Sequence, residues 1–309
     1  MAPVPDTLHP RRIGLFLLVA FGFSWLVGAY VSATGGLAGG TVRASTLTGL
    51  LVVYMFGPAL GHLVVRTVTD AEWSLDAAWL RPHLRKGLRW YVVAWLFPAV
   101  TTLTGVALYY ALFPQHFDLA MEGVRTTLGT EIGSAVSPAT IAVVQLVVAL
   151  TLGPAINTFV AFGEEFGWRG FLLQHLLPLG TRQAVVLTGV VWGVWHWPVI
   201  AMGYNYGFDY PGAPWAGMLA MVWVTVFLGS VLAWVTLRSG SVWPAALGHG
   251  AFNAIAGYGV LFVAGDPSPL LGPFSTGLVV SIPLVVLGGW LLWKPDSFDA
   301  SGVPEASLT

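Results

Sequence analysis

Residues 138–177 read PATIAVVQLVVALTLGPAINTFVAFGEEFGWRGFLLQHLL, forty residues whose charged side chains all lie between positions 164 and 169. A helix that crosses a bilayer needs about 20 mostly apolar residues, each rising about 1.5 Å, so forty residues exceed one straight crossing. Gly153-Pro154 is the natural break, because proline cannot donate to the helical hydrogen-bond ladder. The stretch therefore predicts a membrane helix that is interrupted near its middle.

Seven further apolar stretches precede and follow this one. Of the 309 residues, 56% are hydrophobic and 9% are charged, whereas soluble domains carry roughly 25% charged residues. This composition excludes a water-soluble enzyme and predicts an all-α polytopic integral membrane protein with eight transmembrane helices. The other seven spans are expected at Ile13–Ala33, Thr46–Val68, Trp90–Phe113, Gln183–Met202, Trp215–Leu237, Val242–Val263 and Leu278–Trp293.

The Lys and Arg residues are distributed unequally between alternate loops. Ten of the 13 lie on one side of the expected spans, two lie on the other, and Arg169 lies within the long apolar stretch. Because basic residues accumulate in cytoplasmic loops, the asymmetry predicts a multi-pass protein of the cell (plasma) membrane with both termini in the cytoplasm. The ten are Arg11, Arg12, Arg66, Arg81, Arg85, Lys86, Arg89, Arg182, Arg238 and Lys294, and the two are Arg43 and Arg125.

The first apolar stretch has a second interpretation. Arg11-Arg12, an apolar run and then Val31-Ser32-Ala33 resemble a signal peptide with a cleavage site. Because this run is longer than the usual apolar region of about 7–15 residues, we interpret it as an uncleaved first transmembrane helix. Residues 1–294 are then expected to form a single transmembrane domain, and residues 295–309 a short polar C-terminal tail.

The composition also limits the chemistry of the chain. It contains no cysteine, which excludes disulfides, thiolate metal sites, iron–sulfur clusters and a cysteine nucleophile. Its net charge of −1 provides no basic patch, so nucleic acid is not an expected partner. Only two of the 13 basic residues are lysine, which suggests a GC-rich bacterial genome.

Two adjacent carboxylates and an arginine stand inside the long apolar stretch, where ionisable residues are costly and are functional candidates by default. Glu165 and Arg169 are spaced i, i+4, with the acid first, which is the better order for an ion pair on one helix face. Glu164 lies about 100° around the helix and has no local partner. A buried ion pair that only fixes helix packing explains Glu165 and Arg169, but it does not explain Glu164. A buried carboxylate without a partner has a raised proton affinity, so Glu164 is a candidate acid or base.

Three further polar residues occupy two other expected spans. His196 lies midway along its span, and His249 and Asn253 are spaced i, i+4 on one face of a later span. Taken singly, each is as well explained by hydrogen bonds that hold helices together. Together with Glu164 they place one carboxylate, two imidazoles and one amide on three helices. All of them can meet in the cytoplasmic half of the bilayer, so the helices are expected to enclose an intramembrane site.

The motif residues in chain order are Glu164, Glu165, Arg169, His196, His249 and Asn253. This order resembles the CPBP family, the intramembrane proteases that include the type II CAAX prenyl proteases and the bacteriocin-immunity Abi proteins. The resemblance covers residues 161–253, about a third of the chain, and implies that Glu165 and Arg169 hold the motif helix. One position departs from the pattern: the phenylalanine four residues before the middle histidine is Trp192 here, a change expected to affect packing rather than chemistry.

The resemblance also implies an intramembrane endopeptidase and a role for each polar residue. Glu164 and His196 would activate a water molecule for attack on a peptide carbonyl. His249 and Asn253 would stabilise the oxyanion, a role typically worth about 3–4 kcal/mol per donor.

Glu164, His196 and His249 also form a two-histidine, one-glutamate set, which is a known catalytic zinc sphere with an open position. They are therefore candidate metal ligands, although the HExxH signature is absent. Such residues serve either a metalloprotease or a glutamate-dependent protease without zinc. The cofactor is thus either Zn²⁺ or none, and we favour water activated directly by Glu164.

Two other function classes fit the same composition. A membrane scaffold or bacteriocin-immunity protein would keep the fold without the chemistry, and a transporter would use buried Glu and His to relay protons. The chain shows no repeat of the kind that transporters carry. The expected partners are the lipid bilayer and a membrane-protein or peptide substrate that approaches from the cytoplasmic side.

Overall fold

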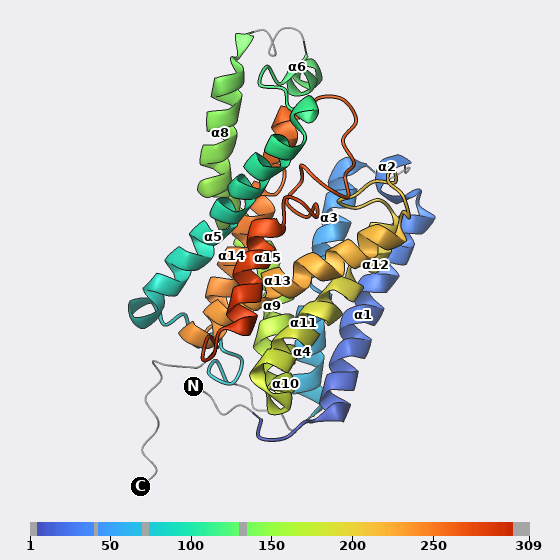
Figure 1. The fold of residues 1–309 in the computed structure, drawn as a ribbon. Coiled ribbons are helices and arrows are strands. Elements are labelled where there is room, and N and C mark those ends of the chain that lie inside the picture. The colour runs from blue at the N-terminus through green and yellow to red at the C-terminus, as the bar shows by residue number, and fades with distance from the viewer. Residues whose placement is uncertain (1–4, 40–42, 70–73, 130–134, 299–309) are drawn as a thin grey trace.

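The computed structural model describes residues 5–39, 43–69, 74–129 and 135–298, which form a bundle of helices (Figure 1). An isolated antiparallel bridge pairs Phe117 with Val263. The π-helical turn Trp168–Leu172 and the 3₁₀ turns Pro114–His116, Leu177–Leu179 and Tyr258–Phe262 connect or extend the helices. The helices are α1 (Pro10–Ala33), α2 (Gly36–Gly39), α3 (Ala44–Met55), α4 (Gly57–Val68), α5 (Leu84–Leu112), α6 (Glu122–Leu128), α8 (Pro138–Leu150), α9 (Leu152–Gly167), α10 (Leu173–Leu176), α11 (Thr181–Trp195), α12 (Trp197–Ala201), α13 (Trp215–Ser239), α14 (Trp243–Ile255) and α15 (Ile282–Trp293).

The helical membrane-protein class is confirmed, whereas the expected count of eight spans is not. Among the described residues, five helical segments are long and apolar enough to cross a membrane, and a bent pair brings the number to as many as six. The five segments are Pro10–Ala33, Ala44–Val68, Leu84–Leu112, Thr181–Ala201 and Trp215–Ser239.

The two expected spans nearest the C-terminus differ most from the structure. The expected spans cover residues 242–263 and 278–293, whereas the helices that form there are shorter. Helix α14 has 13 residues and α15 has 12. At about 1.5 Å per residue each is roughly 20 Å long or less, shorter than the hydrocarbon core of about 30 Å. Nine of the 13 residues of α14 are buried by neighbouring helices. Its apolar composition therefore reflects burial inside the protein as much as contact with lipid.

The long apolar stretch is interrupted as predicted. Helix α8 ends at Leu150, α9 begins at Leu152, and the two segments are bent by 43°. Thr151 at the junction has φ −122° and ψ −83°, outside the helical region, two residues before the expected break at Gly153. The bend directs the second half of the stretch, with its charged residues, into the bundle.

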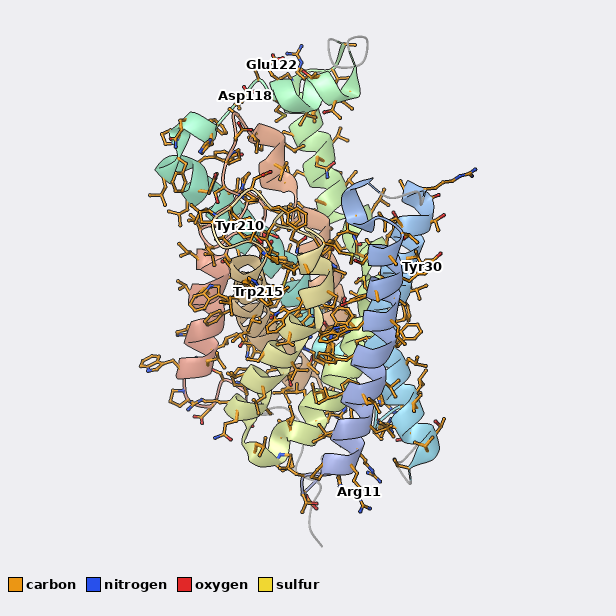
Figure 2. All side chains as sticks on the ribbon, turned by 90° about the vertical axis from the view of Figure 1, so that its right-hand side faces the viewer. Arg11, Tyr30, Asp118, Glu122, Tyr210 and Trp215 are labelled. Carbon is orange, nitrogen blue, oxygen red and sulfur yellow. The ribbon has the colours of Figure 1, made fainter. Side chains whose placement is uncertain are left out.

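The start of α1 and the end of α15 lie at the same end of the bundle (Figure 1). Near the end of α13, Arg238 donates to the carbonyls of Asp296 and Ser297, and Arg182 at the start of α11 donates to the carbonyl of Lys294. Figure 2 shows Arg11 at this end, with Asp118 and Glu122 at the opposite end. Several of the basic residues predicted to share one side of the membrane thus share one end of the protein.

The predicted orientation can be tested with single cysteines, because the chain has none of its own. Lys86 adjoins Gly87, which packs near Ser239 at the end of α13, whereas the exposed Phe208 precedes the start of α13, a helix about 37 Å long. We expect a membrane-impermeant maleimide to label Phe208→Cys in intact cells and Lys86→Cys only after lysis. The opposite pattern would contradict cytoplasmic termini.

Helix α9 packs closely against the start of α4 at a glycine. A Cβ at Gly167 would lie 2.4 Å from the Cβ of Pro58 and 2.5 Å from its carbonyl oxygen, closer than real contacts allow. Small residues are what permit such approaches between membrane helices. Gly167 therefore sets the distance between α4 and the helix that carries Glu164 and Glu165.

We predict that Gly167→Ala lowers the free energy of unfolding by about 1–3 kcal/mol, because the new methyl group overpacks this contact. Thermal denaturation of the purified protein in detergent would measure the effect. Gly22→Ala in α1 is the matched control, since a Cβ there has no neighbour within 4 Å. Equal thermal midpoints for the two variants would show that the close approach does not matter.

Candidate active site

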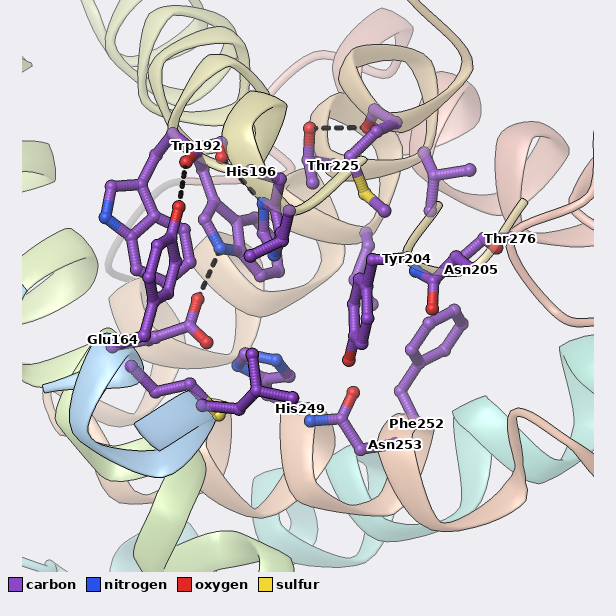
Figure 3. Close-up of a pocket in the computed structure, with 18 residues that line it drawn as sticks. Glu164, Trp192, His196, Tyr204, Asn205, Thr225, His249, Phe252, Asn253 and Thr276 are labelled. Atoms are coloured by element: carbon purple, nitrogen blue, oxygen red, sulfur yellow. Dashed lines mark hydrogen bonds between the residues drawn. The ribbon is translucent and has the colours of Figure 1, made fainter. Parts of the chain in front are cut away.

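One cavity contains the four polar residues expected to act in catalysis (Figure 3). Its walls come from α3, α9, α11, α12, α13 and α14, from His196 between α11 and α12, and from the non-helical segments before α13 and before α15. The four residues are Glu164, His196, His249 and Asn253. The structure therefore brings the motif residues of three helices to a single site.

Glu165 is the buried centre of charge beside this cavity. Its Oε1 accepts a hydrogen bond from Nη1 of Arg169 at 2.8 Å, so the ion pair predicted from the i, i+4 spacing is present. The same oxygen lies 2.9 Å from Nδ1 of His249, a contact between α9 and α14 that the sequence did not predict. Since the carboxylate only accepts, Nδ1 carries the hydrogen, and Nε2 of His249 is left for the cavity.

Glu164 is held by a different partner. The indole Nε1 of Trp192 donates to Oε2 of Glu164 at 2.6 Å, while the other carboxylate oxygen points toward the side of the cavity where His249 lies (Figure 3). Glu164 is only 1% exposed. The structure corrects the expectation that tryptophan at position 192 affects packing alone, because the ring also binds the candidate catalytic carboxylate.

His196 stands at the junction between α11 and α12. Its Nδ1 lies 2.9 Å from the main-chain carbonyl of Trp192, one turn earlier. A carbonyl can only accept, so Nδ1 donates and Nε2 keeps a lone pair that can accept a proton. The helix geometry thus places a basic ring nitrogen of His196 at the cavity that also holds Glu164.

Two helices outside the motif region stabilise this junction. The carbonyl of Trp195 accepts a hydrogen bond from the hydroxyl of Tyr54 in α3 at 2.5 Å. It also accepts one from the indole of Trp25 in α1 at 3.1 Å. The position of His196 therefore depends on α1 and α3 as well as on its own helix.

Two non-helical segments close the cavity on the side of Asn253. Tyr204 points its hydroxyl toward Asn253 (Figure 3), and Thr276 lines the cavity from the segment before α15. Tyr206 joins the two segments, because its hydroxyl donates to the carbonyl of Thr276 at 3.0 Å. Burial raises the pKa of Tyr206 above its ordinary value, so the phenol keeps the hydrogen that this bond needs.

The candidate metal ligands are not arranged as a ligand set. Among the described residues, no three His, Asp or Glu side chains converge in a way that could hold a metal ion. Glu164, His196 and His249 line the same cavity, but each has a protein partner for one of its polar atoms. Their geometry fits separate roles in proton transfer and hydrogen bonding better than shared coordination.

Several cavity residues were not identified from the sequence. The sequence marks Trp192 only as an aromatic residue, although its position four residues before His196 makes its carbonyl the natural acceptor for the His196 ring. Tyr54, Tyr204 and Asn205 carry no spacing pattern that could have singled them out. They reach the cavity through the tertiary fold alone.

We predict that Arg169→Ala costs about 3–5 kcal/mol of stability, because it leaves Glu165 as a buried charge without its cation. The expected result is loss of folded protein from the membrane, measured as the monodisperse fraction after detergent extraction. The double variant Glu165→Gln/Arg169→Gln removes both charges and should recover part of that fraction. An Arg169→Ala protein as stable as wild type would contradict this structural role.

Comparisons with known proteins agree with the family resemblance. Residues 139–255 match the family model described as type II CAAX prenyl endopeptidase Rce1-like. The chain is also similar to CAAX prenyl protease 2 of Methanococcus maripaludis, with 27% identity over 78 residues. That match covers 25% of this chain and 28% of the relative, so it spans only about a quarter of either protein. The matches confirm the resemblance to CPBP-type proteases.

Proposed function

We propose that this chain is an intramembrane endopeptidase, because residues 139–255 match the type II CAAX prenyl endopeptidase family model. It would hydrolyse peptide bonds of membrane-associated or peptide substrates. One observation supports the proposal most: Glu164, His196, His249 and Asn253 line the same cavity although they come from three helices. A scaffold or immunity protein of this fold would not need these four groups to converge.

Glu164 and His196 would together activate the attacking water. Both are anchored to Trp192, and each keeps one acceptor for the cavity: the free carboxylate oxygen of Glu164 and Nε2 of His196. As the water oxygen attacks the peptide carbonyl carbon, its proton passes to this pair. The same proton then goes to the leaving amine when the carbon–nitrogen bond breaks.

His249 and Asn253 would stabilise the negative charge that develops on the carbonyl oxygen. The side-chain amide of Asn253 supplies an N–H donor directly. His249 can donate from Nε2 only if both ring nitrogens carry hydrogen, and Glu165, which accepts from Nδ1, provides the counter-charge for that form. Removing one donor of this kind typically lowers kcat by about 10²–10³.

The rest of the cavity wall suits a substrate that resides in or near the membrane. Apolar side chains such as Leu51, Met55, Met221 and Phe252 line it beside the polar groups. The relative from Methanococcus maripaludis bears the name CAAX prenyl protease, which makes a prenylated CAAX peptide the first substrate to try. We propose that the protein lies in the plasma membrane and that its substrate approaches from the cytoplasmic side.

The proposal predicts that proteolysis depends on Glu164. We expect cells that carry wild type to contain membrane-protein termini that are missing in cells carrying Glu164→Ala, because the variant cannot activate water. Mass spectrometry of peptide termini in the membrane fraction would detect them and would also identify the cleaved sequence.

The exposed carboxylate Glu122, at the far end of the bundle from the start of α1, provides the control. Glu122→Ala should reproduce the wild-type termini. If wild type and Glu164→Ala give the same termini at equal abundance, the protease proposal is wrong and the scaffold or immunity function is favoured.

A further inference from the structure

We propose that Trp192 is a positioning residue of this active site, whose indole N–H orients Glu164 and whose main-chain carbonyl orients His196. The inference rests on the proposed function, because it takes Glu164 and His196 as the pair that activates water. Trp192 holds these two groups in the geometry that the reaction needs.

The indole contact restricts the carboxylate. Nε1 of Trp192 donates to Oε2 of Glu164 at 2.6 Å, and both side chains are 1% exposed. A hydrogen bond from a protein donor to an ionised group is among the stronger kinds, and burial strengthens it further. One oxygen of Glu164 is therefore held while the other is presented to the cavity, which stabilises the carboxylate in its charged, proton-accepting form.

Arg169 strengthens this donor. Its guanidinium carbon lies 4.6 Å from the centroid of the Trp192 ring, and its Nη1 is engaged by Glu165. Its Nε and Nη2 are buried without a hydrogen-bond partner among the described residues, and Nη2 also lies close to Gly229 of α13. A cation over the ring draws electron density from the indole and makes its N–H a better donor.

The main chain of the same residue serves His196. The carbonyl of Trp192 accepts from Nδ1 of His196 at 2.9 Å, which leaves Nε2 as the acceptor. The ring of Trp192 also meets the ring of His249 edge-on, with 5.1 Å between centroids. Trp192 thus contacts Glu164, His196 and His249 at once.

Phenylalanine at position 192 would keep the packing of an aromatic ring but would remove the N–H donor. It would fill most of the space beneath Arg169, and its main-chain carbonyl would still accept from His196, but it would donate nothing to Glu164. Trp192→Phe is therefore a specific test of the indole N–H.

The first measurement is independent of activity. Dicyclohexylcarbodiimide reacts with protonated carboxyl groups in apolar surroundings, so peptide mass spectrometry of the full chain in lipid nanodiscs gives the labelled fraction of Glu164 at each pH. We expect the midpoint of this labelling to move upward by about one to two pH units in Trp192→Phe, because the charged carboxylate loses its donor. An unchanged midpoint overturns the proposal.

Trp195→Phe is the matched control for labelling. Trp195 lies in the same helix and is equally buried, but its Nε1 has no hydrogen-bond partner among the residues that the structure describes. Its midpoint should equal that of wild type. If Trp192→Phe does not fold, 3-benzothienylalanine at position 192 keeps the bicyclic shape and removes only the N–H, and the same shift is expected.

The second measurement uses a farnesylated CAAX peptide with a fluorescent reporter as substrate. Trp192→Phe should lower kcat about 10- to 100-fold with KM within about twofold, and should move the acid limb of the pH–rate profile upward by the same amount as the labelling midpoint. A loss of kcat without that movement would indicate a structural role only and would overturn the proposal. If the labelling midpoints of wild type and Trp192→Phe differ as expected but wild type does not cleave the peptide, the hydrogen bond is supported and the farnesylated CAAX peptide is excluded as a substrate.

Discussion

The site depends on one carboxylate oxygen, Oε1 of Glu165, which binds Arg169 and His249 together. Glu165 and Arg169 are fully buried, where charges persist only when they are paired. Because His249 belongs to α14, the same oxygen fixes α14 against α9. The pair neutralises the interior of the motif helix, so that the charge of Glu164 is the one left to face the cavity.

Hydropathy predicted the class of the protein and most of its long helices, but it extended two expected spans too far, over residues 256–263 and 278–281 at the two ends of the segment 256–281 between α14 and α15. Hydropathy measures preference for an apolar environment, and the interior of a helical bundle satisfies that preference as well as lipid does. The segment contains Gly257, Gly259, Pro267, Pro269 and Pro273, which disfavour a continuous helix. Its apolar residues therefore pack in turns against the bundle instead of crossing the membrane.

The residue types of the site could be read from the sequence, whereas their partners could not. The pairing of Glu165 with Arg169 follows from helix geometry, because four residues separate them. The contact from His249 to Glu165 joins positions 84 residues apart, and the contact from Trp192 to Glu164 joins positions 28 residues apart. Such contacts depend on how the helices pack, so a substitution from phenylalanine to tryptophan could not be recognised as a change in chemistry.

The hydrogen bonds to the carbonyl of Trp195 limit how the sequences of related chains can change. This carbonyl accepts its side-chain hydrogen bonds from Trp25 and Tyr54, which both lie outside the segment that matches the family model. The position of His196, which lies inside the matched segment, therefore depends on two helices that lie outside it. Related chains can therefore differ in sequence along α1 and α3 and keep His196 in place, provided that these helices still offer a donor to that carbonyl.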